Sequence, residues 1–340
     1  MDSFEIARLA GVSRKTVTRV MNHQAGVHPE TRDKVWKVIR ENNYVPNAFA
    51  RKLSSKTTKT IGLIILQDKS FTRIFTDDLY LGPVIGAIMN VASMRGYNVL
   101  TDMVDAEHPE AALTLFREKS IDAGVLIGWN GSEELIAEMT GNGYCFGAFD
   151  YTSIGGSGEY PVPVLDNKYS AYQAASYLLD AGHTDIGFVT GPAESSHALD
   201  RLAGFRLALA ERGLSANEDR IVQGDFSEQA GEAAAKHFLA ALNLPSAVFA
   251  ANDWMAIGLM RGLQRRGVKI PDDVSIIGFD DLILTRYTTP SLTTMKVPTV
   301  AMGMYLINSL VDSIEGKSSL PSPSRFYAEL VERESVTKLK

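Results

Sequence analysis

Hydrophobic residues in the first 45 positions recur at helical spacing in three short segments. The apolar positions of these segments are Ile6, Leu9 and Ala10, then Val17, Val20 and Met21, then Val35, Val38 and Ile39. Asp2 and Glu5 have the spacing of a capping box before the first segment. Pro29 opens the third, where a missing amide hydrogen costs nothing. The pattern predicts three short helices around one small core.

The middle segment, Gly11 to Asn22, has a polar and basic outward side. Ser13 can cap a helix here, and Gly11 permits the sharp turn into it. The residues away from the apolar stripe are Arg14, Lys15, Thr18, Arg19 and Asn22. Such side chains read base edges in the DNA major groove, so the segment is a candidate recognition helix. Taken alone, a basic amphipathic segment is more typical of a solvated surface helix.

From Thr60 onward, apolar runs of strand length alternate with helical ones. The runs fall into two series, 61–66, 84–94, 99–103, 111–116, 124–127 and 145–149, then 162–165, 171–179, 186–190, 202–209, 247–251, 257–263 and 274–279. Alternation of this kind indicates parallel sheets covered by helices on both sides. The stretch Gly155 to Gly158 marks a break between the series, so two lobes are predicted.

Charge is distributed unevenly along the chain. Residues 1–59 contain twelve Lys and Arg against five Asp and Glu, a balance of +7, whereas the remaining 281 residues carry 22 against 35, a balance of −13. Only the N-terminal end is suited to a polyanion, and self-repulsion would turn the acidic body away from phosphates. This asymmetry favours a recognition helix over a solvated surface helix for Gly11 to Asn22.

Composition excludes several classes of protein. With 340 residues, 45% hydrophobic and 22% charged, the chain is typical of a soluble globular protein with two or three domains. It has no cationic-then-apolar start and no apolar run of about 18 residues, so neither export nor a membrane span is indicated, and a cytoplasmic location is expected. Cys145 is the only cysteine, which excludes an intramolecular disulfide.

The stretches LAGVSRKTVTRVMN and PETRDKVWKVIRENNYVPNAFARKL closely resemble the LacI/GalR family of bacterial transcription regulators. The resemblance continues in AGHTDIGFVTGP, RLAGF, FAAND, VSIIGFDD and TPSLTT, so it covers nearly the whole chain. It implies an α/β fold class: an N-terminal three-helix helix-turn-helix DNA-binding domain and a hinge helix, then a two-lobed core of the type I periplasmic-binding-protein kind, with parallel sheets flanked by helices. The domains are then expected at 1–45, 46–59 and 60–340.

In this family the chain crosses between the two lobes of the core three times. We expect the crossings near Pro163, Pro290 and Pro321, each in a polar or proline-containing stretch. The N-lobe would then comprise about 60–162 and 291–320, and the C-lobe about 163–290 and 321–336.

The segment 47–53 alone has the pattern of an amphipathic helix too short to be stable in water, and the polar tract 54–59 after it is typical of a linker. By the resemblance, the segment is a hinge helix that orders on operator DNA, with Leu53 as an apolar wedge in the minor groove. The alternative is that Leu53 packs on the body. The predicted DNA-contacting residues are Ser13, Arg14, Lys15, Thr16, Thr18, Arg19, Asn22, Asn47, Ala50 and Leu53.

Polar residues follow several predicted strands, at the edge where open α/β sheets bind ligands. Asp280, Asn252 and Asp150 each end such a run. Phe226 could offer a ring face to a sugar or a base, and Arg201 offers a planar fork of donors. By the resemblance, the effector-contacting residues are Asp150, Ser195, Arg201, Phe226, Asn252 and Asp280. Alternatively, Arg201 and Asp280 form a structural ion pair, and Phe226 and Asp150 serve packing and capping.

Departures from the family pattern bear on the effector. His28 replaces the usual cap before PETR, and Val297 stands where the family often has a glutamine. The segment 67–83 is longer than usual and contains Phe71, Arg73, Phe75 and Tyr80, which would reshape one wall of the cleft. These differences leave the identity of the effector open.

Catalysis finds little support. The six histidines are scattered, and His197 and Asp200 lack a third metal ligand nearby. Neither a GKS/GKT phosphate loop nor a GxSxG elbow occurs. We therefore expect no enzyme, cofactor or metal. A solute-binding protein of transport is a further alternative, against which the basic N-terminal module argues.

The sequence thus predicts a homodimeric, sequence-specific DNA-binding transcriptional regulator, and a repressor in particular. Its expected partners are pseudo-palindromic operator DNA, a second copy of the chain and a small effector between the lobes of the core, with no membrane partner. Carboxylate and amide groups among the candidates favour a sugar over a purine. The alternative is a corepressor-type regulator that responds to a purine or another metabolite. Effector and DNA affinities would be coupled reciprocally.

Overall fold

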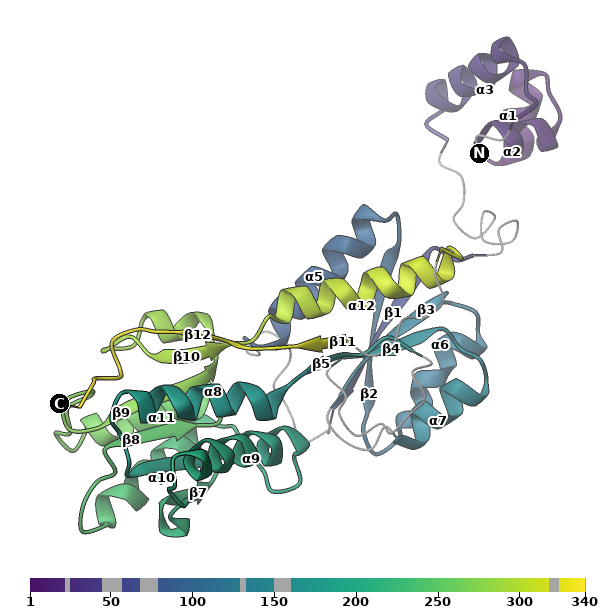
Figure 1. Ribbon diagram of the computed structural model, residues 1–340. Coiled ribbons are helices and arrows are strands. Elements are labelled where there is room, and N and C mark those ends of the chain that lie inside the picture. Colours follow the sequence, from purple (N-terminus) through teal and green to yellow (C-terminus); the bar gives the residue numbers. More distant parts are fainter. Residues whose placement is uncertain are drawn as a thin grey trace. The chain divides into compact units, whose positions relative to one another are not determined.

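The structure is a computed structural model, and it describes residues 1–21, 25–44, 57–67, 79–128, 133–149, 160–317 and 324–339. The chain divides into two compact units, Met1–Thr58 and Lys59–Lys340. Figure 1 labels their helices and strands. Each unit is described by itself.

The described part of the first unit contains the helices α1 (Ser3–Ala10), α2 (Arg14–Met21) and α3 (Pro29–Glu41). The Asp2 carboxylate accepts the amides of Phe4 and Glu5, and the Glu5 carboxylate accepts the Asp2 amide, so the predicted capping box is present. His28 precedes α3 without a side-chain capping bond, as its departure from the family pattern suggested. The core between the helices consists of Ile6, Ala7, Ala10, Val17, Val20, Val35 and Ile39.

The smaller lobe of the second unit is built on a parallel four-stranded sheet in the order β2-β1-β3-β4. The strands are β1 (Thr60–Gln67), β2 (Asn98–Asp105), β3 (Ala123–Ile127) and β4 (Phe146–Ala148). Its helices are α5 (Leu81–Met94), η1 (Pro109–Leu113), α6 (Thr114–Arg117), α7 (Glu133–Gly141) and α12 (Thr299–Ile314). Ile61, Leu63 and Ile65 of β1 pack with α5 and α12, whereas Ile64 and Leu66 pack with α6 and α7, so both sides of the sheet are covered (Figure 1).

The larger lobe contains a six-stranded sheet in the order β12-β10-β9-β8-β6-β7, in which only β12 is antiparallel to its neighbour. The strands are β6 (Ile186–Thr190), β7 (Ile221–Gln223), β8 (Ala247–Ala250), β9 (Ser275–Asp280), β10 (Thr293–Lys296) and β12 (Glu329–Val331). The helices are α8 (Asn167–Asp180), α9 (Ser196–Glu211), η2 (Glu218–Arg220), α10 (Glu228–Ala240), α11 (Asp253–Gln264) and η3 (Ile283–Arg286).

Helices cover both sides of the larger sheet. Phe188 of β6 stacks on Phe205 of α9, with ring centroids 4.8 Å apart. The adjacent Gly187 lies against Phe238 of α10 so closely that a Cβ atom would come within 2.9 Å of its ring. Successive strand residues point to opposite sides, so α9 and α10 lie on opposite sides of the sheet. The predicted architecture of parallel sheets flanked by helices is confirmed.

Three connections join the lobes, near a two-stranded sheet of β5 (Pro163–Leu165) and β11 (Ser324–Phe326). They run from β5 to α8, from β10 to α12 and from β11 to β12. The second connection follows Lys296 rather than Pro290, because Thr293–Lys296 pairs with β9 in the larger sheet. The third follows Phe326, and Pro321, where it was expected, lies outside the described residues.

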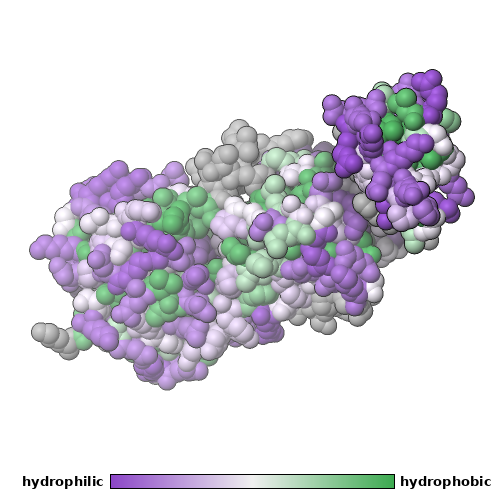
Figure 2. All heavy atoms as spheres, turned by 90° about the horizontal axis from the view of Figure 1, so that it is seen from above, coloured by the Kyte–Doolittle hydropathy of each residue, from purple (hydrophilic) through white to green (hydrophobic). Residues whose placement is uncertain are grey.

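Large apolar side chains are exposed on the smaller lobe. Met89 and Met94 of α5, Leu100 and Met103 of the edge strand β2, and Met304 of α12 are 40–78% exposed. Figure 2 looks down on the side of the core that carries α5 and α12, and hydrophobic residues lie there among hydrophilic ones. Among the described residues, no helix is both long and apolar enough to cross a membrane.

Candidate DNA-binding helix and effector site

Helix α2 presents its polar side to solvent because its apolar side is fully used by the small core. Val17 and Val20 are completely buried. Ser13 Oγ accepts the Thr16 amide at 3.1 Å and so caps the helix, as predicted. Thr18 Oγ1 donates to the Arg14 carbonyl at 3.1 Å, a bond within the helix. The local sequence therefore fixes which side chains remain outward.

The cations of α2 differ in their surroundings. Arg14 Nε donates to Ser3 Oγ at 3.0 Å, and its guanidinium lies 4.7 Å from the centroid of the Phe4 ring. Arg14 is thus tied to α1, which the sequence pattern did not reveal. Lys15 and Arg19 are exposed. The other predicted DNA contacts Asn22, Asn47, Ala50 and Leu53 lie outside the described residues.

The candidate effector residues converge at one edge of the larger sheet. The order β9-β8-β6-β7 makes four parallel strands neighbours, so the residues after each strand meet at their common carboxyl end. These residues are Asp280 at the end of β9, Asn252 after β8, Ser195 after β6 and Phe226 after β7. Arg201 reaches the same edge from α9. Asp150, which follows β4 in the sequence, lies outside the described residues.

Arg201 is the most constrained member of this group. Its side chain is 6% exposed, Nε donates to Asn167 Oδ1 at 2.8 Å, and Nη1 donates to the Ala251 carbonyl. The guanidinium lies over the Phe279 ring, 3.8 Å from its centroid. Nη1 is also 3.8 Å from Asp280 Oδ1, longer than a charge-assisted hydrogen bond of about 2.7–2.9 Å. Arg201 and Asp280 therefore attract one another without a close contact.

Asn167 is a site residue that the sequence analysis missed. It is 1% exposed, opens α8 directly after β5, and binds Arg201. Its position after a strand could have drawn attention to it. The bond to a residue 34 positions later could not be read from the sequence.

Asn252 and Phe226 are linked by the backbone. Asn252 Oδ1 accepts the Met255 amide at 2.9 Å and caps α11, while Nδ2 donates to the Phe226 carbonyl at 2.9 Å. Phe226 has a φ of +68°. Its ring covers Gly191, where a Cβ atom would come within 2.2 Å of the ring. One side of the ring is thereby fixed against the backbone after β6, where only glycine leaves room.

Ser195 caps α9, since its Oγ accepts the Ala198 amide at 3.4 Å. A fully buried carboxyl, Asp253, follows Asn252. It accepts the Thr294 hydroxyl at 2.6 Å and the Leu282 amide at 2.8 Å. Burial, reinforced by the nearby charge of Asp280, raises the pKa of the Asp253 carboxyl well above its usual value. The edge therefore concentrates charged groups in a region of low solvent access.

The histidines and carboxylates of the described residues do not gather into a metal-binding cluster. No group of three or more His, Cys, Asp or Glu side chains in the described part of the chain is placed to hold a metal ion. His183 is buried, and its ring nitrogens contact Ser246 Oγ at 3.1 Å and the Thr337 carbonyl at 3.0 Å. Burial lowers the pKa of His183, and its Nε2 contact with Thr337 helps to hold the C-terminal segment.

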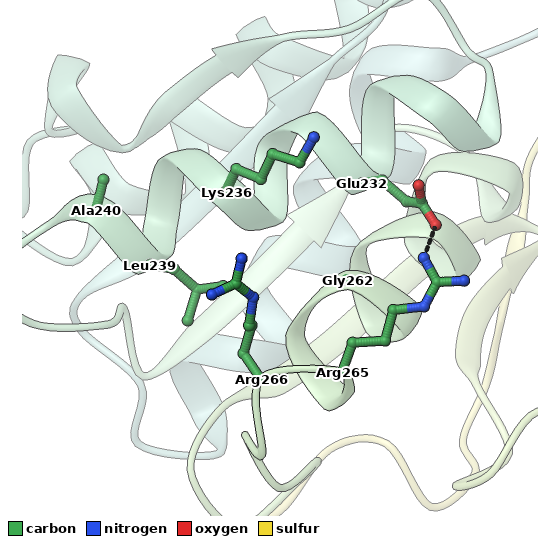
Figure 3. A pocket seen from close by; sticks show the side chains of 7 residues that line it. All are labelled: Glu232, Lys236, Leu239, Ala240, Gly262, Arg265 and Arg266. Carbon is green, nitrogen blue, oxygen red and sulfur yellow. Dashed lines mark hydrogen bonds and ion pairs between the residues drawn. The ribbon is translucent and has the colours of Figure 1, made fainter.

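A hollow of about 560 Å³ lies elsewhere, between α10 and α11 (Figure 3). Its lining includes Lys236, Arg265 and Arg266, which come from the C-terminal ends of the two helices. Helix C-termini attract cations, and Glu232 pairs with Arg265 at 3.1 Å. These helices run back against the strand direction, so the hollow is remote from the carboxyl edge with Asp280. The cations that line the hollow are therefore accounted for by the helix C-termini and by the pair with Glu232, and they do not indicate a ligand site.

Both units of the chain are similar to known protein families. Residues 4–47 match the family described as bacterial regulatory proteins, lacI family, and residues 175–336 match a periplasmic binding protein-like domain. The HTH-type transcriptional repressor PurR of Vibrio campbellii (strain ATCC BAA-1116) is 34% identical over 342 residues, which cover 98% of each chain. PurR of Erwinia tasmaniensis is 33% identical and covers 98% of this chain and 96% of its own.

Two solved structures illustrate the likeness in three dimensions. The transcriptional regulator CelR in complex with cellobiose is 28% identical, has a TM-score of 0.73, and covers 97% of this chain and 98% of its own. The lac repressor dimer bound to operator and the anti-inducer ONPF is 24% identical, with a TM-score of 0.85 and 99% coverage of both chains. The second likeness concerns the fold alone.

Proposed function

This chain belongs to the lacI family of bacterial regulatory proteins, and we propose that it is a cytoplasmic repressor. A small sugar controls its affinity for a pseudo-palindromic operator. As a member of that family it is a DNA-binding transcriptional regulator with an effector-binding core. The observation that carries the proposal is the pairing of a basic helix-turn-helix unit with a charged edge on the larger sheet.

In the DNA complex, α2 lies in the major groove. Lys15 and Arg19 face base edges and phosphates, and Ser13, Thr16 and Thr18 approach the backbone. These residues are exposed or, for the two threonines, partly exposed on a helix whose other side is buried, which supports these roles. Arg14 contributes to a phosphate contact from its position beside Phe4. Asn22, Asn47, Ala50 and the Leu53 wedge complete the proposed interface.

At the effector edge, Asp280 accepts hydrogen bonds from sugar hydroxyls and Arg201 donates to hydroxyl oxygens. The 3.8 Å separation of these two groups supports this arrangement, because a hydroxyl between them can donate to one and accept from the other. Asn252, Ser195 and Asp150 supply further polar contacts, and the Phe226 ring offers a platform. A purine is the second candidate, since a flat base would stack on that ring.

The active form is a homodimer. The exposed Met89, Met94 and Met103 lie on the adjacent elements α5 and β2 and support self-association, because a group of large apolar side chains in solvent favours an interface. A homodimer places two copies of α2 for two half-sites, which accounts for the pseudo-palindromic operator.

A thermal-shift screen of the full chain with D-glucose, cellobiose, D-ribose, hypoxanthine and guanine tests the effector assignment. A compound that binds the folded state raises the melting temperature. Asp280→Ala is expected to abolish that shift, whereas the control Asp185→Ala, which removes a carboxylate paired with Arg220 at 2.9 Å, is expected to preserve it. A normal shift in Asp280→Ala would remove Asp280 from the site.

Selection from a randomised duplex pool tests the DNA assignment. We expect an enriched pseudo-palindrome whose binding weakens steeply with salt, because Lys and Arg displace phosphate counterions. Leu53→Ala is expected to lower affinity for this duplex and to leave effector binding unchanged. Binding without sequence preference would contradict a role in specific repression.

A further inference from the structure

The turn after β9 has an unusual backbone. Asp280 and Asp281 both have positive φ angles, +125° and +60°, although neither is glycine. L-residues adopt such angles at a cost in free energy, so the surrounding contacts must hold the turn in this shape. Asp280 is the residue that faces Arg201, and its direction depends on this turn.

Arg333 holds the turn from one side. Nη2 forms an ion pair with Asp281 Oδ1, and Nη1 donates to Thr285 Oγ1 at 2.9 Å and to the Leu292 carbonyl at 2.7 Å. The side chains of Arg333 and Asp281 are only 13% and 6% exposed. A planar guanidinium that binds three partners in a region of low solvent access restricts their relative movement.

Asp253 holds the turn from the other side. Its carboxyl accepts the amide of Leu282, the residue directly after the two strained positions. The carboxyl lies close against β9, since a Cβ atom at Gly278 would come within 2.2 Å of Asp253 Oδ1. The turn is therefore anchored at Asp281 and again at Leu282.

Arg333 reaches this turn from the segment that follows β12, after the last connection between the lobes has entered the larger sheet. The chain passes from β11 through Tyr327 and Ala328 into β12, and Arg333 follows two residues after β12 ends. The Arg333 amide donates to Thr293 Oγ1 at 2.9 Å, which fixes the segment on β10. The segment after β12 is thus joined to the effector edge through the Arg333 side chain.

We propose that Arg333 and Asp281 are positioning residues for the effector site: their ion pair holds the turn that directs the Asp280 carboxylate toward Arg201. The proposal rests on the assignment of Asp280 to effector binding. Neither residue is assigned a contact with the effector, and the pair acts through the backbone of the turn.

Arg220 provides a matched control. Its side chain is 12% exposed, close to the value for Arg333. It binds Asp185 at 3.2 and 2.9 Å and the Asn243 carbonyl at 2.8 Å. These contacts lie before β6 and β8, at the opposite edge of the sheet from Asp280. Loss of Arg220 therefore removes a comparable ion pair without touching the turn.

Hydrogen–deuterium exchange of the full chain tests the pair without any ligand. Arg333→Met is expected to increase exchange in residues 275–286 selectively, whereas Arg220→Met is expected to leave that segment unchanged. Arg333→Lys, which keeps the charge, is expected to fall between the wild type and Arg333→Met. Wild-type exchange of this segment in Arg333→Met would overturn the proposal. If Arg333→Met does not fold, Asp281→Asn replaces it, with the same expectation.

Calorimetry then measures the functional effect with cellobiose or hypoxanthine, whichever raises the wild-type melting temperature. We expect Arg333→Met to lose affinity on the order of tenfold or more, Arg333→Lys to recover part of it, and Arg220→Met to stay within about twofold. Wild-type affinity in Arg333→Met would overturn the proposal. If neither probe binds the wild type, that result counts against the effector assignment, and the exchange experiment still decides whether the pair holds the turn.

Discussion

The two functional regions of this protein place their ionisable side chains in opposite environments. In the first unit, Lys15 and Arg19 project into solvent from a helix held by a small apolar core. At the edge of the larger sheet, Arg201 and Asp253 are almost completely buried, and each binds groups from distant parts of the chain.

In the first unit, the residues proposed to bind the ligand differ from those that stabilise the fold. At the edge of the larger sheet, the same residues do both. Exposed cations contribute little to folding, so their removal affects mainly the DNA complex. A buried charge depends on its partners, so its removal affects the fold as well as the ligand. The following substitutions test this contrast, from the largest expected effect to the smallest.

Arg201→Met is expected to have the largest effect. It removes a buried guanidinium that binds Asn167 and lies 3.8 Å from Asp280, and breaking a buried pair costs about 3–5 kcal/mol. Urea unfolding of the second unit measures the loss. The control Arg325→Met removes an ion pair whose arginine is 72% exposed and is expected to cost less than about 1 kcal/mol. Equal losses in the two variants would contradict the contrast.

Ile6→Ala tests the small core of the first unit. Ile6 is completely buried, and such a truncation costs about 2–5 kcal/mol. With so few core residues, the three-helix unit is expected to unfold and DNA binding to disappear, while the thermal shift caused by the effector persists. The exposed neighbour Leu9 serves as control, since Leu9→Ala should preserve DNA binding.

Lys15→Ala tests the exposed side of α2. The melting temperature of the first unit should stay close to that of the wild type, because the change in folding free energy is expected within about 0.5 kcal/mol. Affinity for the selected duplex should fall by about 1–3 kcal/mol if Lys15 contacts a base. Fluorescence anisotropy measures this loss, and Lys236→Ala on α10 is the control. A large change in stability would show that Lys15 is not a pure binding residue.

Glu315→Gln tests an exposed cluster of charges on the second unit and is expected to have the smallest effect on stability. Glu315 contacts Lys317 at 2.7 Å and Arg95 at 3.0 Å, and these cations lower its pKa to about 2. A depressed carboxyl pKa stabilises the fold above its unfolded value, 4.5, and this contribution disappears as the pH falls toward 2. The wild type should lose stability relative to Glu315→Gln over that interval. The measurement is the free energy of unfolding of both proteins as a function of pH. A constant difference between the wild type and Glu315→Gln over that interval would contradict this contribution.

Much of the fold followed from local patterns. The capping box at Asp2 and Glu5 and the apolar stripes of the first unit depend on residues three or four positions apart. The capping box is present, and the predicted stripes form the core except at Leu9, which is 48% exposed. The continuous apolar run of β1 indicated a strand covered on both sides. By contrast, β10 was missed because Thr293 and Thr294 are buried polar residues in a strand without an apolar run. The second connection between the lobes was consequently placed several residues too early.

Local sequence patterns predicted only some of the residues at the candidate effector site. Asp280 and Asn252 could be found because each ends a predicted strand, and Phe226 because of its aromatic ring, although β7 before it was not predicted. Their neighbourhood then depends on strand order. Asn167, Asp281 and Arg333 were missed. Asn167 binds Arg201, 34 residues away, and Asp281 binds Arg333, 52 residues away. No periodic pattern in the sequence indicates bonds over such distances.

The amino-acid sequence by itself determined the helices of the first unit, the basic character of that unit and the alternation of strands and helices, because these features depend on residues close together in the chain. Only the tertiary structure decided which charges are buried together and which turn is held under strain. The physical reason is that a buried ion pair requires two distant segments to meet at hydrogen-bond distance, and strand order and close packing of the whole lobe determine that meeting.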